Sequence, residues 1–352
     1  MLRSRIAVGQ SLYLALYAAL LGAALLGAAL LGAALLGACS GEPAPTDGQA
    51  EGKRLGQALT QHIETSMELR APFRCARFPT DARGPNMERV SWDDTSGALV
   101  VKPYGSEPRF ATIADARASS ATDVSALERL RDSLNEQDVD VLISLGGLGR
   151  DEESIEQVLK ALTMGARYLV LAFPGALESL PAHRSAIASL AKNGVRILDA
   201  TRYRFTQLGE LRLATMPGIA KTAHLVAGDS GCVHIEADIE ELLANLAIAS
   251  RPTVLLSYAP WRQQGDEATD LGIGDIHAGE LELSPLERSE HVSALVHGML
   301  SSREMANDGS IRLAQPPASI PTGSLSQDAA SPSALMLSVA GAKLSWKRLP
   351  VH

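Results

Sequence analysis

The strongest constraint on the fold is an alternation of short apolar segments with helical patterns in the middle of the chain. The apolar segments have the length of buried strands, and the segments between them place leucines on one helical face. Strands that alternate with helices predict sheets covered by helices. We therefore expect an α/β fold, a layered sheet sandwich flanked by helices. The central strands are expected as neighbours at residues 110–113, 139–143, 168–173 and 254–257.

The same patterns predict the remaining elements. Helices are expected at 54–69, 121–135, 151–164, 180–192, 238–249 and 286–300. A strand is expected at 98–101 and another at 195–198, with hairpins at 204–214 and 335–346. Residues 316–332 are rich in Pro, Ser and Ala and predict a loop.

The N-terminus carries an export signal. Arg3 and Arg5 are followed by an uncharged stretch that ends in Leu36-Gly37-Ala38-Cys39. A basic start, an apolar run and small residues before a cut predict a secretory signal peptide over residues 1–38. The ending resembles the lipobox of bacterial lipoproteins, which implies that Cys39 becomes the mature N-terminus and carries diacylglycerol and palmitate.

The alternative is a retained transmembrane helix, because the apolar run exceeds the roughly 7–15 residues of an ordinary signal. Its Leu-Leu-Gly-Ala-Ala repeat spaces the glycines five apart, from Gly22 to Gly37, so they share no helix face. We interpret the repeat as an expanded signal core. Residues 39–54 are then a lipidated flexible tether and residues 55–352 a single domain.

These features predict a membrane-anchored protein of the cell envelope. Ser40 is not the aspartate that marks inner-membrane retention in some bacteria, which favours the outer membrane, facing the periplasm. The formal net charge is −8, and the only charges of the leader are Arg3 and Arg5, so the mature chain is more acidic still. An acidic chain with 4% aromatic residues and no basic run argues against a nucleic-acid partner.

Two cysteines remain once Cys39 carries lipid. Disulfides persist in oxidising compartments, so Cys75 and Cys232 are expected to form one. The alternative is a pair of buried free thiols.

Short motifs follow the predicted strands. They are Asp115-Ala116-Arg117, Gly146-Gly147, Pro174-Gly175-Ala176-Leu177-Glu178-Ser179, Ser257-Tyr258-Ala259-Pro260 and Gly298-Met299-Leu300-Ser301. Their order resembles the metal-binding motifs of the calcineurin-like metallophosphoesterases: D-x-H, G-D, P-G-N-H-D-S, S-H-A-P and G-H-x-H. The resemblance covers roughly residues 109–303 and implies that family's fold, with two divalent metals that activate water and clamp phosphate oxygens. The alternative is an unrelated α/β domain.

Most of the implied ligands are replaced. The substituted positions are Arg117, Gly147, Ala176, Leu177, Tyr258, Met299 and Ser301, while Asp115, Glu178, Asp270 and His277 remain. Few charges are left to offset a pair of divalent cations, and the guanidinium of Arg117 would repel them. We therefore expect no metal and no other cofactor, and we expect Arg117 to pair with Asp115. The strand ends should converge on a mostly apolar cleft, which suits small-molecule or peptide binding.

Three hypotheses follow. The first is a non-catalytic, phosphoesterase-like lipoprotein, a pseudoenzyme, that binds an unknown envelope protein or a small anionic ligand through Arg117 and Tyr258. The second is a divergent metal-dependent phosphoesterase that uses the four remaining polar residues and two metals. The third is a purely structural envelope lipoprotein.

A second motif has a plainer interpretation. Gly228-Asp229-Ser230-Gly231 matches the G-D-S-G around the nucleophile of trypsin-like proteases, but alternating strands and helices do not predict a double β-barrel. We interpret it as a turn that positions Cys232. His224 and His234 flank it without the spacing of a known metal site, so surface or loop histidines are expected.

Overall fold

The computed structural model describes residues 72–79, 83–220, 222–248, 251–265, 268–271, 277–299, 308–313, 317–322 and 333–350. The chain divides into residues 1–63 and residues 64–352, and every described residue belongs to the second unit. The predicted signal peptide, Cys39, the tether and the helix at 54–69 lie outside the described residues. Within those ranges, no helix is both long enough and apolar enough to cross a bilayer.

Two large sheets dominate the described part of the chain, each with seven strands. The first, here called the β4 sheet, has the order β13-β16-β15-β4-β5-β6-β7. Its strands β4, β5, β6 and β7 are parallel neighbours, whereas β15 runs antiparallel to β4. The bounds are β4 Arg109–Ile113, β5 Val141–Ser144, β6 Leu169–Ala172, β7 Ile197–Asp199, β13 Asp308–Arg312, β15 Ser333–Ala340 and β16 Lys343–Pro350.

The second, the β11 sheet, has the order β14-β12-β11-β9-β8-β3-β2. Its strands are β2 Val90–Asp93, β3 Ala98–Val101, β8 Phe205–Leu208, β9 Leu211–Met216, β11 Thr253–Ser257, β12 Val292–His297 and β14 Ala318–Pro321. A two-stranded sheet pairs β1, Phe73–Arg74, in parallel with β10, Cys232–Val233. Two short 3-10 helices, Thr222–His224 and Gly228–Ser230, precede β10.

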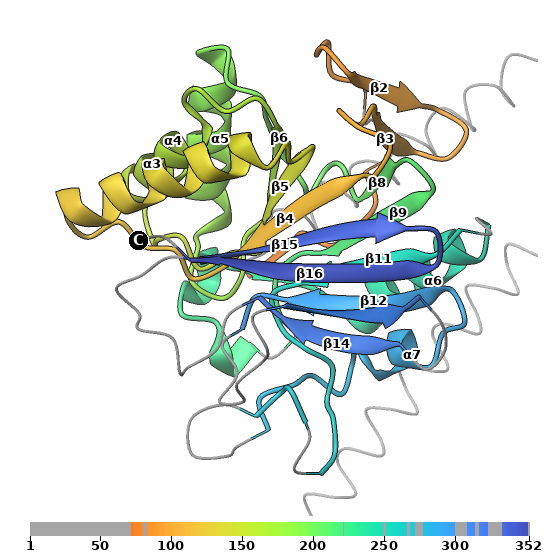
Figure 1. The fold of residues 1–352 in the computed structure, drawn as a ribbon. Helices are drawn as coiled ribbons and strands as arrows, with labels where there is room; N and C mark the ends of the chain where they lie inside the picture. The colour runs from red at the N-terminus through yellow and green to blue at the C-terminus, as the bar shows by residue number, and fades with distance from the viewer. Residues whose placement is uncertain are drawn as a thin grey trace, which may run out of the picture. The chain divides into compact units, whose positions relative to one another are not determined.

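Helices cover the outer faces of both sheets. Figure 1 shows α3, α4 and α5 grouped beside β4, β5 and β6. These helices span α3 Ala121–Glu136, α4 Glu152–Thr163 and α5 Leu180–Lys192, whereas α6 Glu236–Ala247 and α7 Ser284–Glu287 pack on the β11 sheet. A third apolar layer fills the space between the sheets. It includes Phe110 and Ile143 from one sheet and Val254 and Leu256 from the other. The predicted layered sandwich flanked by helices is therefore confirmed.

Local sequence explains why the helices form where they do. In α4, Ile155, Val158, Leu159 and Leu162 are fully buried and recur at helical spacing. Burial of each such side chain contributes roughly 1.5–3 kcal/mol before the entropic cost of ordering it. The helix begins at Asp151, whose carboxylate accepts a hydrogen bond from the Ser154 backbone N–H at 2.8 Å.

Three predictions about elements are wrong. Strand β11 lies in the second sheet and not beside β4, β5 and β6. Residues 286–300 do not form a helix, because α7 ends at Glu287 and the buried strand β12 follows. Within the predicted loop 316–332, β14 pairs in parallel with β12.

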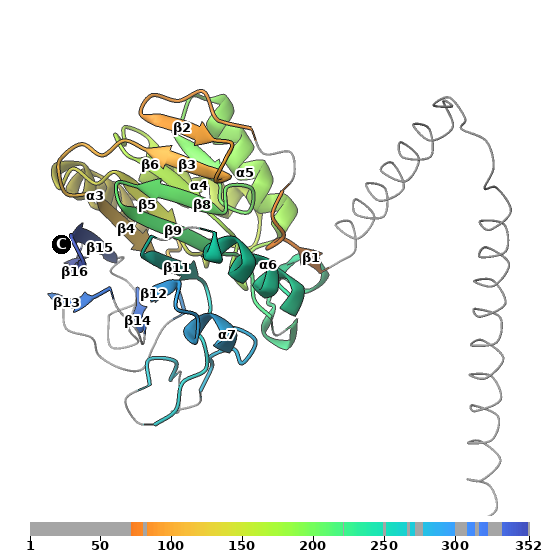
Figure 2. The ribbon, with the colours of Figure 1, turned by 90° about the vertical axis from the view of Figure 1, so that its right-hand side faces the viewer.

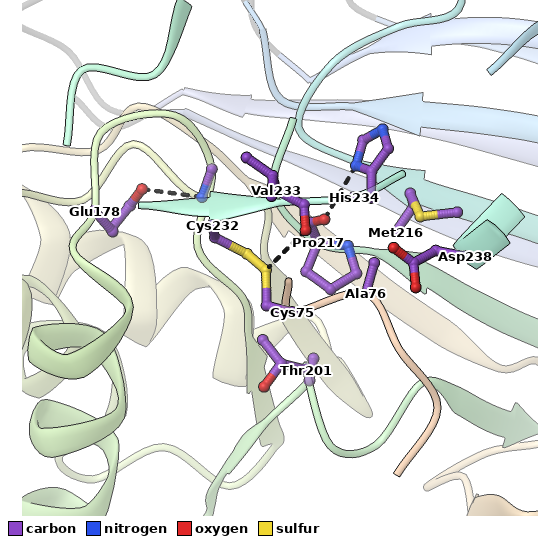
Figure 3. The surroundings of a disulfide bond; sticks show 12 residues. Cys75, Ala76, Glu178, Thr201, Met216, Pro217, Cys232, Val233, His234 and Asp238 are labelled. Carbon is purple, nitrogen blue, oxygen red and sulfur yellow. Dashed lines mark hydrogen bonds between the residues drawn. A yellow bond between two sulfur atoms is a disulfide. The ribbon is translucent and has the colours of Figure 1, made fainter. Parts of the chain in front are cut away.

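The predicted disulfide between Cys75 and Cys232 is confirmed, with a Cα–Cα distance of 5.7 Å. It joins the residue after β1 to the first residue of β10, and both side chains are buried. Figure 2 shows β1 next to α6, and Figure 3 shows the surroundings of the bond. The disulfide therefore ties the first described segment of the chain to the loop that precedes α6.

Candidate functional site

The loops after β4, β5, β6 and β11 meet at one edge of the sandwich. We call the group Asp115, Gly147, Gly175, Glu178 and Tyr258 the strand-end site. The Asp115 backbone N–H donates to the carbonyl of Gly146 at 2.9 Å, and the Tyr258 hydroxyl donates to Asp115 Oδ1 at 3.3 Å. The structure thus brings together strand ends that belong to two different sheets.

Glycines make this close approach possible. A Cβ atom on Gly147 would lie 2.7 Å from Asp115 Cα, and one on Gly175 would lie 2.7 Å from Cγ of Tyr258. Gly147 also has φ +81°, a conformation that side chains other than glycine rarely adopt. The position that matches the family's bridging aspartate therefore has neither the space nor the backbone conformation for a side chain.

Glu178 holds two of these loops together. Its side chain is fully buried, Oε1 accepts the Leu148 N–H at 2.7 Å, and Oε2 accepts the Gly175 N–H at 3.0 Å. Burial raises the pKa of this carboxyl, and the backbone N–H donors only partly oppose that effect. Glu178, the acidic residue of the third motif, therefore hydrogen-bonds to backbone N–H groups.

Asp115 is the titratable group of the strand-end site. The pKa of Asp115 is raised to about 7: burial and then the nearby Glu178 raise it, and Arg117 and the Tyr258 hydroxyl only partly oppose them. Asp115 also adopts φ +51°, in the left-handed region. The pKa of the Tyr258 hydroxyl is raised, first by burial and then by Asp115.

The predicted ion pair between Arg117 and Asp115 is wrong. Arg117 is exposed, and within the described residues it makes no ion pair with that carboxylate. Its effect on Asp115 is a longer-range attraction. The Tyr258 hydroxyl is directed to Asp115, and the anion site at Arg117 and Tyr258 stays a prediction.

Side chains predicted to line the apolar cleft pack against one another. Ala176 packs in a buried cluster with partly buried Tyr258 and Met299, and Leu177 is 9% exposed. The Met299 N–H donates to the carbonyl of Tyr258 at 2.7 Å, which joins the last motif to the fourth. Ser301 lies outside the described residues.

Asp270 and His277 form a separate pair. His277 Nδ1 lies 2.8 Å from Asp270 Oδ1. The other oxygen of Asp270 accepts the N–H groups of Gln263 at 3.2 Å and Gly279 at 3.3 Å. Asp270 therefore organises its own loop.

The two histidines that flank the Gly228–Gly231 turn differ in burial. His224 is exposed, and His234 lies in the loop between β10 and α6, so the prediction of surface or loop histidines is confirmed. His234 is nevertheless buried, with Nε2 3.0 Å from Glu280 Oε2. His234 Nδ1 also contacts the carbonyl of Pro217. No local sequence pattern signals this contact, because it joins two different segments. Sequence reasoning also missed His297, a buried histidine at the end of β12, whose pKa burial lowers to about 4.

The donor set does not fit a pair of metal ions. Among the described residues, no three His, Cys, Asp or Glu side chains are placed to hold a metal ion. At the strand-end site the physical obstacles are specific, since Gly147 has no room for a ligand and Glu178 is bonded to the backbone. We therefore derive no chemical step through metals.

Comparison with known proteins supports the fold. No protein-family model and no curated protein sequence matches the chain. The solved structure of TT1561 from Thermus thermophilus is similar over 70% of this chain and 100% of its own, with TM-score 0.50 and 13% identity. A dimetal phosphatase from Danio rerio is similar over 69% of this chain and 98% of its own, with TM-score 0.45 and 12% identity.

Another solved structure has TM-score 0.52 at 13% identity, over 70% of this chain and 100% of its own. The predicted α/β fold, a layered sheet sandwich flanked by helices, is confirmed, and the two structures with TM-scores of 0.50 and 0.52 share it. At these identities the likeness concerns the fold alone, and function must come from the residues of this chain.

Proposed function

We propose that this chain is a lipid-anchored envelope protein whose phosphoesterase-like domain binds a ligand or partner and does not hydrolyse phosphate esters. One observation carries the proposal: the Tyr258 ring packs directly on the backbone of Gly175 while its hydroxyl donates to Asp115. Protein atoms thus occupy the place where the strand ends meet.

The chemistry of ester hydrolysis supports the same conclusion. A two-metal phosphoesterase must stabilise both the attacking and the leaving oxygen. The strand-end site offers no cation for either task, since Arg117 is exposed and unpaired with Asp115, and its two carboxylates are held by Tyr258 and by backbone N–H groups. A divergent hydrolase would need Asp115 and Glu178 to leave these partners.

The test is a phosphatase assay on the detergent-solubilised full chain. We expect no hydrolysis of p-nitrophenyl phosphate or bis-p-nitrophenyl phosphate above background with Mn, Fe or Zn added, and no stoichiometric metal after purification without chelator. The control variant is Asp115→Ala. Metal-dependent turnover that is lost in this variant would establish the divergent hydrolase.

The anchor is tested separately. Replacement of Cys39 by Ser should abolish labelling by fatty acid and partition into the detergent phase, because the thiol is the proposed site of attachment. Partition that does not change would favour a retained transmembrane helix in place of a lipid anchor.

A further inference from the structure

A polar pocket opens at the edge of the β4 sheet where β4 and β5 begin. Its volume is about 380 Å³, within the range of roughly 300–1,000 Å³ for small-molecule sites. The strand-end site follows the other ends of these parallel strands, so the pocket and that site lie at opposite edges of the sheet. We call this opening the Tyr104 pocket. The residues that line it are Tyr104, Gly105, Ser106, Glu107, Arg109 and Asp138.

The buried carboxylate of Asp140 holds the loop that forms the pocket. Asp140 is 2% exposed, and it accepts the backbone N–H groups of Tyr104 at 2.6 Å and Arg109 at 3.0 Å. The Arg89 guanidinium donates to the same carboxylate at 3.0 Å and lies 3.2 Å from the centre of the Tyr104 ring. The Tyr104 hydroxyl donates to the carbonyl of Arg167 at 2.6 Å. The loop is therefore positioned before any ligand arrives, which reduces the entropic cost of binding.

Two opposite charges in the lining have no charged side chain as a partner. Arg109 donates from one guanidinium nitrogen to the carbonyl of Gln137 at 2.8 Å, which leaves further N–H donors on the same group. Among the residues that the structure describes, no carboxylate forms an ion pair with Arg109, and the Glu107 side chain makes no ion pair or hydrogen bond. Asp138, by contrast, lies 3.2 Å from Arg167. A guanidinium and a carboxylate thus line one opening without being paired to each other.

This lining disfavours ligands that carry charge of one sign only. A purely anionic ligand would meet the Glu107 carboxylate, and a purely cationic ligand would meet the Arg109 guanidinium, so like charges would oppose each of them. A molecule with both a carboxylate and an ammonium group gives each residue a partner. Only Pro108 separates Glu107 from Arg109, so the two charges of the ligand must also lie close together.

We infer that the Tyr104 pocket binds a small zwitterion of the α-amino acid class. The ligand carboxylate pairs with Arg109 through paired N–H donors, and the ligand ammonium group donates to the Glu107 carboxylate. The volume of about 380 Å³ leaves space for an amino-acid side chain beside the two charged groups. The inference goes beyond the proposed function, because the pocket shares no residue with the strand-end site.

The test is titration calorimetry on the detergent-solubilised full chain with L-alanine, L-leucine and L-glutamine. We expect saturable binding of at least one of them. The N-acetyl derivative of the tightest binder lacks the ammonium charge, and its amide lacks the carboxylate charge. Each derivative should bind about tenfold or more weakly than the parent amino acid, which corresponds to about 1.4 kcal/mol.

Glu107→Gln is the main variant, because Glu107 is exposed and its carboxylate has no hydrogen bond within the described part of the chain. It should weaken the amino acid about tenfold and should not weaken the N-acetyl derivative, which has no ammonium group for Glu107 to meet. Arg109→Lys should weaken the amino acid more than its amide, because lysine keeps the charge but loses the paired donors. The matched control is Glu128→Gln, which removes the same charge from an exposed position on α3 and should leave affinity within about twofold.

The outcomes separate this inference from the proposed function. Absence of saturable binding of all three amino acids, or equal losses in Glu107→Gln and Glu128→Gln, would overturn the pocket assignment. A derivative that binds as tightly as its parent would overturn the choice of a zwitterion. The phosphatase assay measures a different site, so hydrolysis of p-nitrophenyl phosphate would contradict the non-hydrolytic proposal and leave the pocket assignment standing.

Discussion

The strand-end site and a second cavity, here called the arginine pocket, differ in how the fold treats charge. At the strand-end site, Glu178 and Asp115 are turned to backbone N–H groups and to the Tyr258 hydroxyl. The arginine pocket has a volume of about 480 Å³, and in its wall Arg74 lies 2.8 Å from Asp238 and Arg184 lies 3.4 Å from Asp199.

The difference shows that the residues of the family motifs and the charged residues that line a cavity need not coincide. The family motifs select residues at strand ends, and in this chain those residues pack against one another. The arginines that line the second cavity come from segments that carry no motif, and the disulfide holds one of these segments in place. Four predictions can break or sharpen this contrast, and they are given from the largest expected effect to the smallest, with the pH dependence counted per pH unit.

Loss of the disulfide should have the largest effect on the free energy of unfolding, and it should release the segment around Arg74. The bond joins residues 157 positions apart, and removal of a bond that closes so long a loop costs about 4 kcal/mol of unfolding free energy. The variant Cys75→Ser with Cys232→Ser should show this loss in urea unfolding. Reductant should not change the double variant further. A loss below about 1 kcal/mol would mean that the bond does not constrain the segment around Arg74.

A methyl group at Gly175 should destabilise the strand-end site. The added Cβ would lie 2.7 Å from Cγ of the Tyr258 ring, and such overpacking costs about 2 kcal/mol. Gly105→Ala is the matched control, because a Cβ there meets nothing within 4 Å. Urea unfolding measures both variants.

A second background makes the test of Gly175 specific. In Tyr258→Ala the cost of Gly175→Ala should shrink, because the ring that meets the new methyl group is gone. An equal cost in both backgrounds would show that the ring does not close the site.

The titration of Asp115 should appear as a pH dependence of stability. Its pKa is about 7 in the folded chain and 3.8 in the unfolded reference, so the folded state binds the proton more tightly. The contribution of protonated Asp115 to the free energy of unfolding is complete below pH 4. It is lost as the pH rises through 7, by up to about 1.4 kcal/mol per pH unit. Urea unfolding from pH 4 to 8 should show a steeper fall for the native chain than for Asp115→Asn. Parallel curves would contradict a buried Asp115 carboxyl with a raised pKa.

Removal of the Tyr258 hydroxyl should have the smallest effect. Tyr258→Phe keeps the ring on Gly175 and removes only the hydrogen bond of 3.3 Å to Asp115, which costs about 1 kcal/mol. The pKa of Asp115 should rise in this variant, because the hydroxyl lowers it in the native chain. A carboxyl titration by NMR that does not move would show that the two groups are not bonded in solution.

Parts of the fold could be predicted because local pattern and tertiary environment agree. The helix α5 was predicted with its observed bounds, 180–192, and the strand β4, Arg109–Ile113, was predicted at 110–113. Residues 286–300 were predicted wrongly as a helix because β12 is buried on both faces, so all of its side chains are sheltered and no alternation marks it as a strand. The strand β11 was placed in the wrong sheet because an apolar segment does not specify its neighbour.

The sequence by itself determined the layered α/β fold, the order of the motifs at the strand ends, and the pair Cys75 and Cys232 that forms the disulfide. These depend on periodicity, local order and compartment, which a linear pattern records. Only the tertiary structure decided that Arg117 stays exposed, that Tyr258 closes on Gly175, and that four arginines surround one cavity. Side-chain direction and charge balance arise where distant segments meet, and no spacing along the chain encodes that meeting.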